Sequence, residues 1–378
     1  MDETKKLICE VLNEIADNIE KGDFSKKVSI GLTILGSELG LDEMIKGAEF
    51  TSKKYTDFEI VLIGPKTDSK LRTIEANTPE ECHKTMDKLL ESGEIQGAVT
   101  QHYDFPIGVA TVGRVITPAR GKEMLMGTTT GTASTSRIEA MVLNAVSSIA
   151  VAKCIGILHP KIGILNVEGS RSVERILLEM KKRGYDIDFA ESIRADGGVV
   201  MRGNDLLMGT PDIMLCDSLT GNLLMKVFSS FTSGGDYETS GYGYGPGVGE
   251  GYDKIISIIS RASGTPVICE ALRFCASCVK GDLVKLAKEE FERANACGFK
   301  ELLVKKETIE ETVKPPPKKA VTEEILGIDI LDLEDACKAL WKEGIYSESG
   351  MGCTGPVLLV PGDELDHAIL ILEKAGYK

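Results

Sequence analysis

Along the first 300 residues, apolar positions alternate between helical and strand-like patterns. A stripe of an amphipathic helix runs through Leu7, Val11, Ile15 and Ile19. Further helical patterns begin near Leu41 and cover residues 135–155 and 281–298. Continuous apolar runs, typical of strands buried on both faces, occupy residues 28–32, 58–64, 97–101, 161–167 and 212–217. Because strands and helices alternate, we expect an α/β fold with a largely parallel, helix-flanked sheet in a two-lobed body.

The periodicity breaks at "ETVKPPPKKAV", which contains three consecutive prolines between lysines. Such a stretch is typical of a linker. We therefore predict a body at residues 1–312, a linker at 313–320 and a small α/β module at 321–378. In the module, helical patterns flank the apolar strand "PVLLV", and Asp363 is expected to cap the second helix.

The composition excludes several classes of function. The chain has 378 residues, 42% of them hydrophobic, and a formal net charge of −14. This charge repels nucleic acid and anionic membranes. The N-terminus shows no signal-peptide pattern and no run reaches the ~20 apolar residues of a membrane span, so we expect a cytoplasmic protein. There the ten cysteines should be reduced thiols, buried by default and catalytic by exception.

The segment "MGTTTGTASTSRIEAM" puts glycines and short hydroxyl side chains in front of a helix. Backbone N–H groups at a helix N-terminus attract anions, so the segment is a candidate phosphate cradle, although it lacks the lysine of a Walker motif. A plain polar loop ending in a helix cap is the alternative. The candidate residues are Thr128, Thr129 and Thr130.

A second candidate is "DIMLCDSLTGNLLMK", in which a buried strand ends at Asp217 and Ser218 and turns into a helix. Ligands of open α/β sheets lie at the carboxyl ends of strands, so these side chains would face a ligand. Asp217 could instead only cap the helix, which would stabilise the protein by ~1 kcal/mol.

Two further motifs have both a functional and a plain interpretation. The glycine-rich "DYETSGYGYGPGVGEGYD" excludes a helix or an interior strand and leaves a lid over a site, which we favour, or a surface loop. The Cys-x-x-Cys spacing of Cys275 and Cys278, near Cys269, lacks a second pair and a nearby histidine, which favours core thiols. The four histidines show no ligand spacing, and we expect no metal and no cofactor.

Cys353 lies in "SESGMGCTGPVLLV" between glycines that free the backbone. Gly352, Thr354 and Gly355 could expose successive N–H groups to an acyl oxygen, as in an oxyanion hole. Oriented N–H groups would also lower the thiol pKa from its usual ~8.5 and increase the thiolate fraction. A tight turn that merely tolerates cysteine is the alternative, and the spacing alone does not decide between them.

The segments "KIGILNVEG", "NDLLMGTPDIMLCDSLTGNLLMK" and "GTPVICE" resemble, in order and spacing, those of the phosphate acyltransferase family of phospholipid synthesis. That family makes acyl phosphates from acyl thioesters and inorganic phosphate. The resemblance implies a phosphate acyltransferase-like body and adds Asn166, Asn222, Arg171 and Lys226 as residues that bind phosphate or the acyl group.

With "SESGMGCTGPVLLV" included, the whole chain resembles the family of alpha subunits of component C of the glycine/sarcosine/betaine reductase complex. This resemblance implies an acetyl thioester on Cys353 that inorganic phosphate, as substrate, cleaves to acetyl phosphate. It also implies a beta subunit and a carboxymethylated selenoprotein as partners within an oligomeric complex. The amine donor and the stoichiometry stay open.

The chain departs from the acyltransferases in two places. About ten residues, instead of a long apolar hairpin, separate Lys226 from Asp236, so membrane binding and long-chain recognition are not expected. Glu270 and Ala271 follow the "PVIC" run, which we interpret as a strand, where the family has His-Gly. Two rival functions stay open: a direct phosphate acetyltransferase that uses a soluble thioester, and a non-catalytic scaffold. The linker is compatible with a pivoting module and with one fixed cleft.

Overall fold

The computed structural model describes residues 27–194, 197–303, 313–352 and 355–378. The N-terminal helix expected around Leu7 to Ile19 lies outside these residues. The strands of the body are β1 (Val28–Thr33), β2 (Phe58–Gly64), β3 (Arg72–Glu75), β4 (Gly97–Thr100), β5 (Val109–Ile116), β6 (Glu123–Thr132), β7 (Lys161–Leu165), β8 (Asp188–Phe189), β9 (Val200–Met201), β10 (Ile213–Leu215), β11 (Gly245–Gly249) and β12 (Ile256–Ile258).

These strands form a single sheet in the order β3-β2-β1-β4-β12-β11-β5-β6-β10-β7-β8, with β9 also paired to β7. Within the described residues, the pairs β11–β12, β11–β5 and β5–β6 are antiparallel and the other pairs are parallel. The expected α/β class and largely parallel sheet are therefore confirmed.

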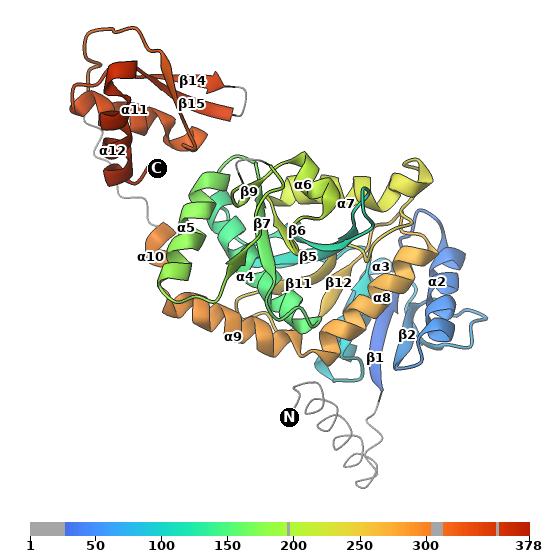
Figure 1. Cartoon of the computed structure of the whole chain (residues 1–378). Helices are drawn as coiled ribbons and strands as arrows, with labels where there is room; N and C mark the ends of the chain where they lie inside the picture. The colour runs from blue at the N-terminus through green and yellow to red at the C-terminus, as the bar shows by residue number, and fades with distance from the viewer. Residues whose placement is uncertain (1–26, 195–196, 304–312, 353–354) are drawn as a thin grey trace, which may run out of the picture.

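Helices cover both faces of the sheet (Figure 1). They are α2 (Leu41–Lys54), α3 (Pro79–Glu91), α4 (Arg137–Cys154), α5 (Ser170–Lys182), α6 (Gly203–Met208), α7 (Ser218–Ser230), the 3-10 turn η1 (Phe231–Ser233), α8 (Thr265–Lys280), α9 (Leu283–Ala296) and α10 (Phe299–Leu303). One apolar core joins the sheet to α2, α4, α5, α8 and α9, and a second joins its other face to α3, α6 and α7. Most residues of the strongly apolar helix α4 are buried, and the helix lies at the centre of the first core.

The middle of the glycine-rich segment is not a surface loop. Its residues 245–249 form β11, an interior strand that is buried throughout. The glycines are needed for close approach: a Cβ at Gly245 would collide with the carbonyl of Val112, and one at Gly247 with the ring of Phe105. The expectation that this segment excludes an interior strand was wrong, because packing of bare backbone replaces packing of side chains here.

Two other expectations about local structure were wrong. The "PVIC" run lies in helix α8, because Pro266 occupies its first turn, where a missing N–H costs nothing. Residues Thr128 to Thr132 continue strand β6 instead of forming a loop. The polar segment before α4 is therefore shorter than the sequence suggested.

The C-terminal residues form a small module, seen beside α5 in Figure 1. Its sheet has the order β13-β15-β14 and is antiparallel. The elements are β13 (Glu323–Leu326), η2 (Ile330–Asp332), α11 (Leu333–Lys342), β14 (Glu348–Gly352), β15 (Gly355–Val360), η3 (Gly362–Glu364) and α12 (Leu365–Ala375). Asp363 lies within η3 and Glu364 precedes α12, so the expected cap at Asp363 was wrong. A separate core, which includes Ile325, Leu340, Leu358 and Leu372, stabilises the module.

Candidate functional site

Polar side chains gather at the carboxyl ends of four neighbouring strands. β6, β10, β7 and β9 are parallel to one another where they pair, so their carboxyl ends lie at one edge of the sheet. Thr128–Thr132 form the carboxyl end of β6, and the other three strands lead into Asp217, Asn166 and Arg202, respectively. This is the edge at which open α/β sheets bind ligands.

A cavity of about 190 Å³, here called the threonine cavity, lies where β6 and β10 end. It brings together the two segments that the sequence indicated separately. Its lining residues are Thr128, Gly131, Thr132, Ala133, Ser134, Thr135, Arg137, Ala140, Met141, Asn144, Asp217, Ser218 and Leu219. The first turns of α4 and α7 both border the cavity, and N–H groups at helix N-termini are donors suited to an anion.

The threonine side chains of β6 mainly hold the backbone in place. The buried hydroxyl of Thr128 donates to the carbonyl of Thr111 at 2.9 Å, and that of Thr129 donates to the carbonyl of Tyr244 at 2.7 Å. The amide of Thr130 donates to the hydroxyl of Thr111 at 3.0 Å. Thr128 therefore borders the threonine cavity with its hydroxyl already bonded, whereas Thr130 lines an adjoining recess of about 180 Å³ with Asn222.

The turn after β10 is locked against the end of β6. Asp217 caps α7: its carboxylate accepts from the amide and the hydroxyl of Thr220 at 3.1 and 2.6 Å. Asn222 donates to the carbonyl of Thr129 at 3.0 Å, and a Cβ at Gly221 would collide with the carbonyl of Thr128. The cap that the sequence offered as an alternative is thus present, and it fixes Ser218 at the cavity wall.

Two lining residues were not identified from the sequence. Asn144 is 2% exposed, and its Oδ1 has no hydrogen-bond partner within the described part of the chain. Arg137 begins α4, and its guanidinium lies 2.9 Å from Glu168. Arg137 is the first cationic residue after the threonine-rich segment, a signal that could have revealed it.

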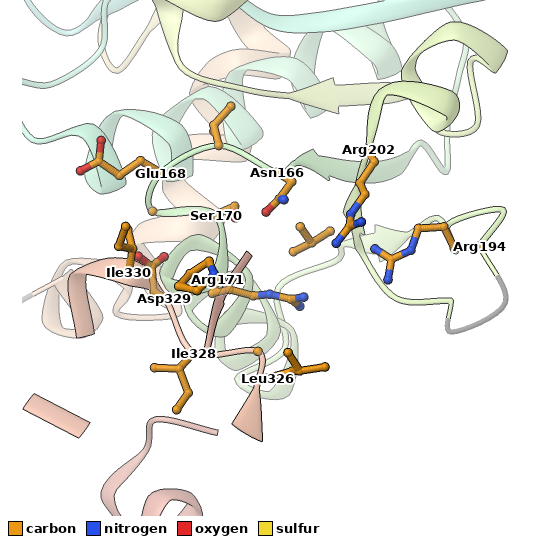
Figure 2. A pocket seen from close by; sticks show the side chains of 15 residues that line it. Asn166, Glu168, Ser170, Arg171, Arg194, Arg202, Leu326, Ile328, Asp329 and Ile330 are labelled. Carbon is orange, nitrogen blue, oxygen red and sulfur yellow. The ribbon is translucent and has the colours of Figure 1, made fainter. Parts of the chain in front are cut away.

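Asn166 and Arg171 line a second, larger cavity of about 600 Å³, here called the arginine cleft. Figure 2 shows the side chains of Arg171, Arg194 and Arg202 gathered on one side of this cleft. The opposite wall comes from the module: Leu326, Gly327, Ile328, Asp329, Ile330 and Pro356. Arg194 and Arg202 were not identified from the sequence, because a loop and the end of a two-residue strand show no periodicity.

Contacts between α5 and the module close this cleft on one side. The amide of Ser172 donates to Asp329 at 3.4 Å, and Arg175 lies 2.5 Å from the carboxylate of Asp332. Arg175 also donates to the carbonyl of Gly376 near the C-terminus. Lys319, in the predicted linker, pairs with Glu364 of η3 at 2.5 Å. The module therefore packs on the N-terminal half of α5 through polar contacts.

Cys353 and Thr354 lie outside the described residues. Their neighbours Gly352 and Gly355 are register partners at the ends of β14 and β15, and Pro356 of β15 lines the arginine cleft. The predicted roles of Cys353 as a nucleophile and of Gly352, Thr354 and Gly355 as oxyanion support stay predictions.

Lys226 lies beside the recess that Thr130 lines. Its ammonium group is 3.1 Å from the carboxylate of Glu238 and donates to Ser260 at 2.8 Å. Glu238 is fully buried and also accepts from Ser263 at 3.0 Å. Burial and the Glu238 charge raise the pKa of Tyr244 well above its usual range. Lys226 thus neutralises a buried carboxylate.

Most of the described cysteines of the body are core residues, whereas Cys297 is half-buried. Cys216, Cys269, Cys275 and Cys278 are at most 1% exposed. Burial raises the pKa of Cys216 and that of Cys275 to about 12, which disfavours the thiolate at neutral pH. Among the described residues, no group of His, Cys, Asp and Glu side chains could hold a metal ion.

A family model described as "Fatty acid synthesis protein" matches residues 28–359. The chain is 53% identical over 382 residues to the "Glycine/sarcosine/betaine reductase complex component C subunit alpha" of Peptoclostridium acidaminophilum, covering 100% of this chain and 99% of that relative. The chain belongs to this family of component C alpha subunits.

More distant relatives of this component C alpha family member match part of its length. The "Phosphate acyltransferase" of Thermotoga petrophila is 26% identical over 236 residues, which cover 53% of this chain and 68% of the relative. A crystal structure of a branched-chain phosphotransacylase from Enterococcus faecalis V583 matches 67% of this chain and 99% of its own, with 17% identity and a TM-score of 0.47. No helix among the described residues is long and apolar enough to span a bilayer.

Proposed function

We propose that the chain transfers an acetyl group from a thioester on Cys353 to inorganic phosphate and releases acetyl phosphate. The observation that carries this proposal is the threonine cavity, in which the first turns of two helices, Arg137 and the buried Asn144 border one small space. Its size and donors suit a phosphate ion. The names of the relatives support acyl transfer to phosphate in general.

The chemistry requires few groups. A phosphate oxygen attacks the thioester carbonyl, forms the C–O bond and gives a tetrahedral oxyanion. The C–S bond then breaks and the electron pair leaves on sulfur as the Cys353 thiolate. The site must bind phosphate, stabilise the oxyanion and exclude water, which competes as nucleophile. We assign phosphate binding to the threonine cavity and oxyanion support to the backbone of residues 352–355.

In this proposal the module delivers the acetyl group along the arginine cleft. Pro356 belongs to β15, follows Cys353 closely in the sequence, and lines the cleft beside Asn166 and Arg171. The Arg137–Glu168 ion pair joins the two cavities, since Arg137 lines the first and Glu168 the second. The name of the relative indicates a multisubunit complex, and we propose that a beta subunit and a carboxymethylated selenoprotein supply the acetyl unit in it.

The test is arsenate-dependent breakdown of acetyl phosphate by the purified chain, comparing wild type with Cys353→Ala. Acetyl phosphate acetylates the thiol and releases phosphate, and arsenate then removes the acetyl group as acetyl arsenate, which hydrolyses. Mass spectrometry should find an acetylated peptide spanning Gly350 to Pro356 in the wild type. The Cys353→Ala variant should have no breakdown activity. Cys216→Ala is the control, because this buried thiol has no assigned role.

Full activity of Cys353→Ala would contradict the covalent route and favour direct transfer from a soluble thioester. If both the Cys353→Ala variant and the Ser218→Ala/Asn144→Ala variant kept full activity, another protein would be responsible for the measured turnover. The chain would then be a non-catalytic scaffold.

A further inference from the structure

Asn144 is a polar residue in the apolar helix α4, and its side chain lacks a hydrogen bond that its burial requires. The residue is 2% exposed, and no group in the described ranges donates to its Oδ1. The hydroxyl of Ser148, one turn further along α4, is fully buried and equally without a partner there, so it does not satisfy Asn144. An unpaired buried acceptor destabilises a protein, and a ligand that donates to it removes this penalty.

The threonine cavity, which Asn144 lines, offers both donors and acceptors to a ligand. The first turns of α4 and α7 supply N–H donors, and Arg137 supplies a cation. Among the described residues that line the cavity, Asp217 is the one anion and Arg137 the one cation, so the two charges cancel. A fully ionised anion would therefore leave Asn144 Oδ1 unpaired and meet the carboxylate of Asp217. An anion that also carries a hydroxyl group fits better, because it accepts from the N–H groups and donates to Asn144.

We propose that the threonine cavity selects a tetrahedral oxyanion that carries a proton, and that Asn144 makes this selection by accepting a hydrogen bond from the hydroxyl group of the ion. At neutral pH, inorganic phosphate and arsenate carry at least one proton, whereas sulfate, which has the same shape, carries none. A site built around a hydrogen bond to a substrate hydroxyl rejects an analogue that lacks it, because the acceptor then stays unpaired.

This inference rests on the proposed function only in that it takes the threonine cavity as the phosphate site. The hydrogen bond to Asn144 also orients the bound ion. It holds the protonated oxygen, so that an unprotonated oxygen, which is the better nucleophile, is left to attack the thioester carbonyl. The selection itself is measured without a thioester, because binding of the free anions reports it.

The test is isothermal titration calorimetry of the full-length chain with phosphate and with sulfate, at neutral pH in a buffer free of other oxyanions. Wild type should bind phosphate at least about 10-fold more tightly than sulfate, the loss expected for one unpaired buried acceptor. Asn144→Leu, which has a similar volume and no acceptor, should reduce this preference about 10-fold. Asn144→Asp keeps an acceptor, so it should lower both affinities through its charge and retain the preference.

Two further variants show where the anions bind. Arg137→Ala should weaken the binding of phosphate and sulfate by similar factors, because its charge attracts both anions to the cavity. Ser147→Ala is the matched control: Ser147 is 1% exposed on α4 and is not among the residues that line the cavity, so both affinities should stay unchanged.

Equal affinities of the wild type for phosphate and sulfate, or binding of neither, would overturn the proposal. A preference that is unchanged in Asn144→Leu, at an unchanged melting temperature, would overturn it as well. The wild-type comparison needs no variant, so the proposal can be tested even if Asn144→Leu does not fold. Full activity of Cys353→Ala would contradict the covalent route without altering these affinities, which distinguishes a failure of the proposed function from a failure of this inference.

Discussion

The guanidinium of Arg137 lies 2.9 Å from the carboxylate of Glu168, and these two residues line different cavities. Both side chains are about half exposed, at 47% and 50%. A pair of this kind contributes less than about 1 kcal/mol to stability, so its effect should be seen in ligand binding and not in folding.

Arg137→Ala should raise the KM for arsenate, which takes the place of phosphate, in arsenate-dependent breakdown of acetyl phosphate by about 10- to 100-fold, the loss expected for a hydrogen bond to a charged ligand. Glu168→Gln should lower this KM, because it removes the anion that competes with arsenate for Arg137. Steady-state kinetics at varied arsenate concentrations measures both. An unchanged KM in Arg137→Ala, with an unchanged melting temperature, would remove Arg137 from the phosphate site.

Gly221→Ala should destabilise the protein by about 1–3 kcal/mol, because its Cβ would overlap the carbonyl of Thr128 at the end of β6. Urea denaturation measures the free energy of unfolding. Gly203→Ala in α6 is the matched control, since a Cβ there meets nothing within 4 Å. If Gly221→Ala were as stable as this control, the turn after β10 would not be locked on β6.

The ionisation of Asp57 makes the free energy of unfolding depend on pH. Burial alone would raise its pKa, but hydrogen bonds from Lys280 and Arg273 outweigh this effect and hold the pKa at about 2. Its unfolded value is about 3.9. A depressed pKa stabilises the fold above the unfolded value, and this contribution is lost as the pH falls through the folded value.

Asp57→Asn should therefore reduce the free energy of unfolding at pH 7, by less than about 1 kcal/mol because Asp57 is 45% exposed and screened. The difference from wild type should shrink between about pH 4 and pH 2. Denaturation at several pH values measures it, with Asp104→Asn, 96% exposed, as the control. A difference that grows toward low pH would contradict the depressed pKa.

Arg175→Ala should loosen the module, because Arg175 pairs with Asp332 at 2.5 Å and donates to the carbonyl of Gly376. Trypsin should then cut the linker at Lys318 or Lys319 about 5- to 10-fold faster, which corresponds to the loss of one exposed ion pair and one hydrogen bond. Arg183→Ala follows α5 but pairs with Glu179 and Glu301, so its cleavage rate should equal that of wild type. Equal rates for both variants would show that the contact with α5 does not hold the module.

Periodicity predicted the apolar parts of this fold. The strands from Val28 to Thr33 and from Phe58 to Gly64 and the helix beginning at Leu41 were predicted within a residue or two, because burial on one or both faces leaves a pattern. The pattern failed at β11, whose glycines leave no hydrophobic signal, and at α8, where a short apolar run of "PVIC" suits a strand as well as a helix.

Part of the candidate site could be predicted in the same way. The carboxyl-end rule placed Asp217 and Ser218 at a ligand edge, and the structure adds Thr128 to the same cavity. Asn166 and Arg171 belong to the arginine cleft instead, because β7 lies one strand beyond β10. Sequence spacing does not show which strand ends are neighbours, since strand order depends on crossovers through the whole sheet.

Strand β11 joins the two halves of the sheet, pairing with β12 on one side and β5 on the other. Gly245, Gly247 and Gly249 leave no space for a Cβ, so the distance between the halves is set by backbone alone. A larger residue cannot be compensated by repacking a neighbour, because the colliding atoms at Gly245 and Gly249 are main-chain carbonyls. During sequence divergence, the core residues on either side of β11 can therefore change, but the glycines of β11 itself can hardly be replaced.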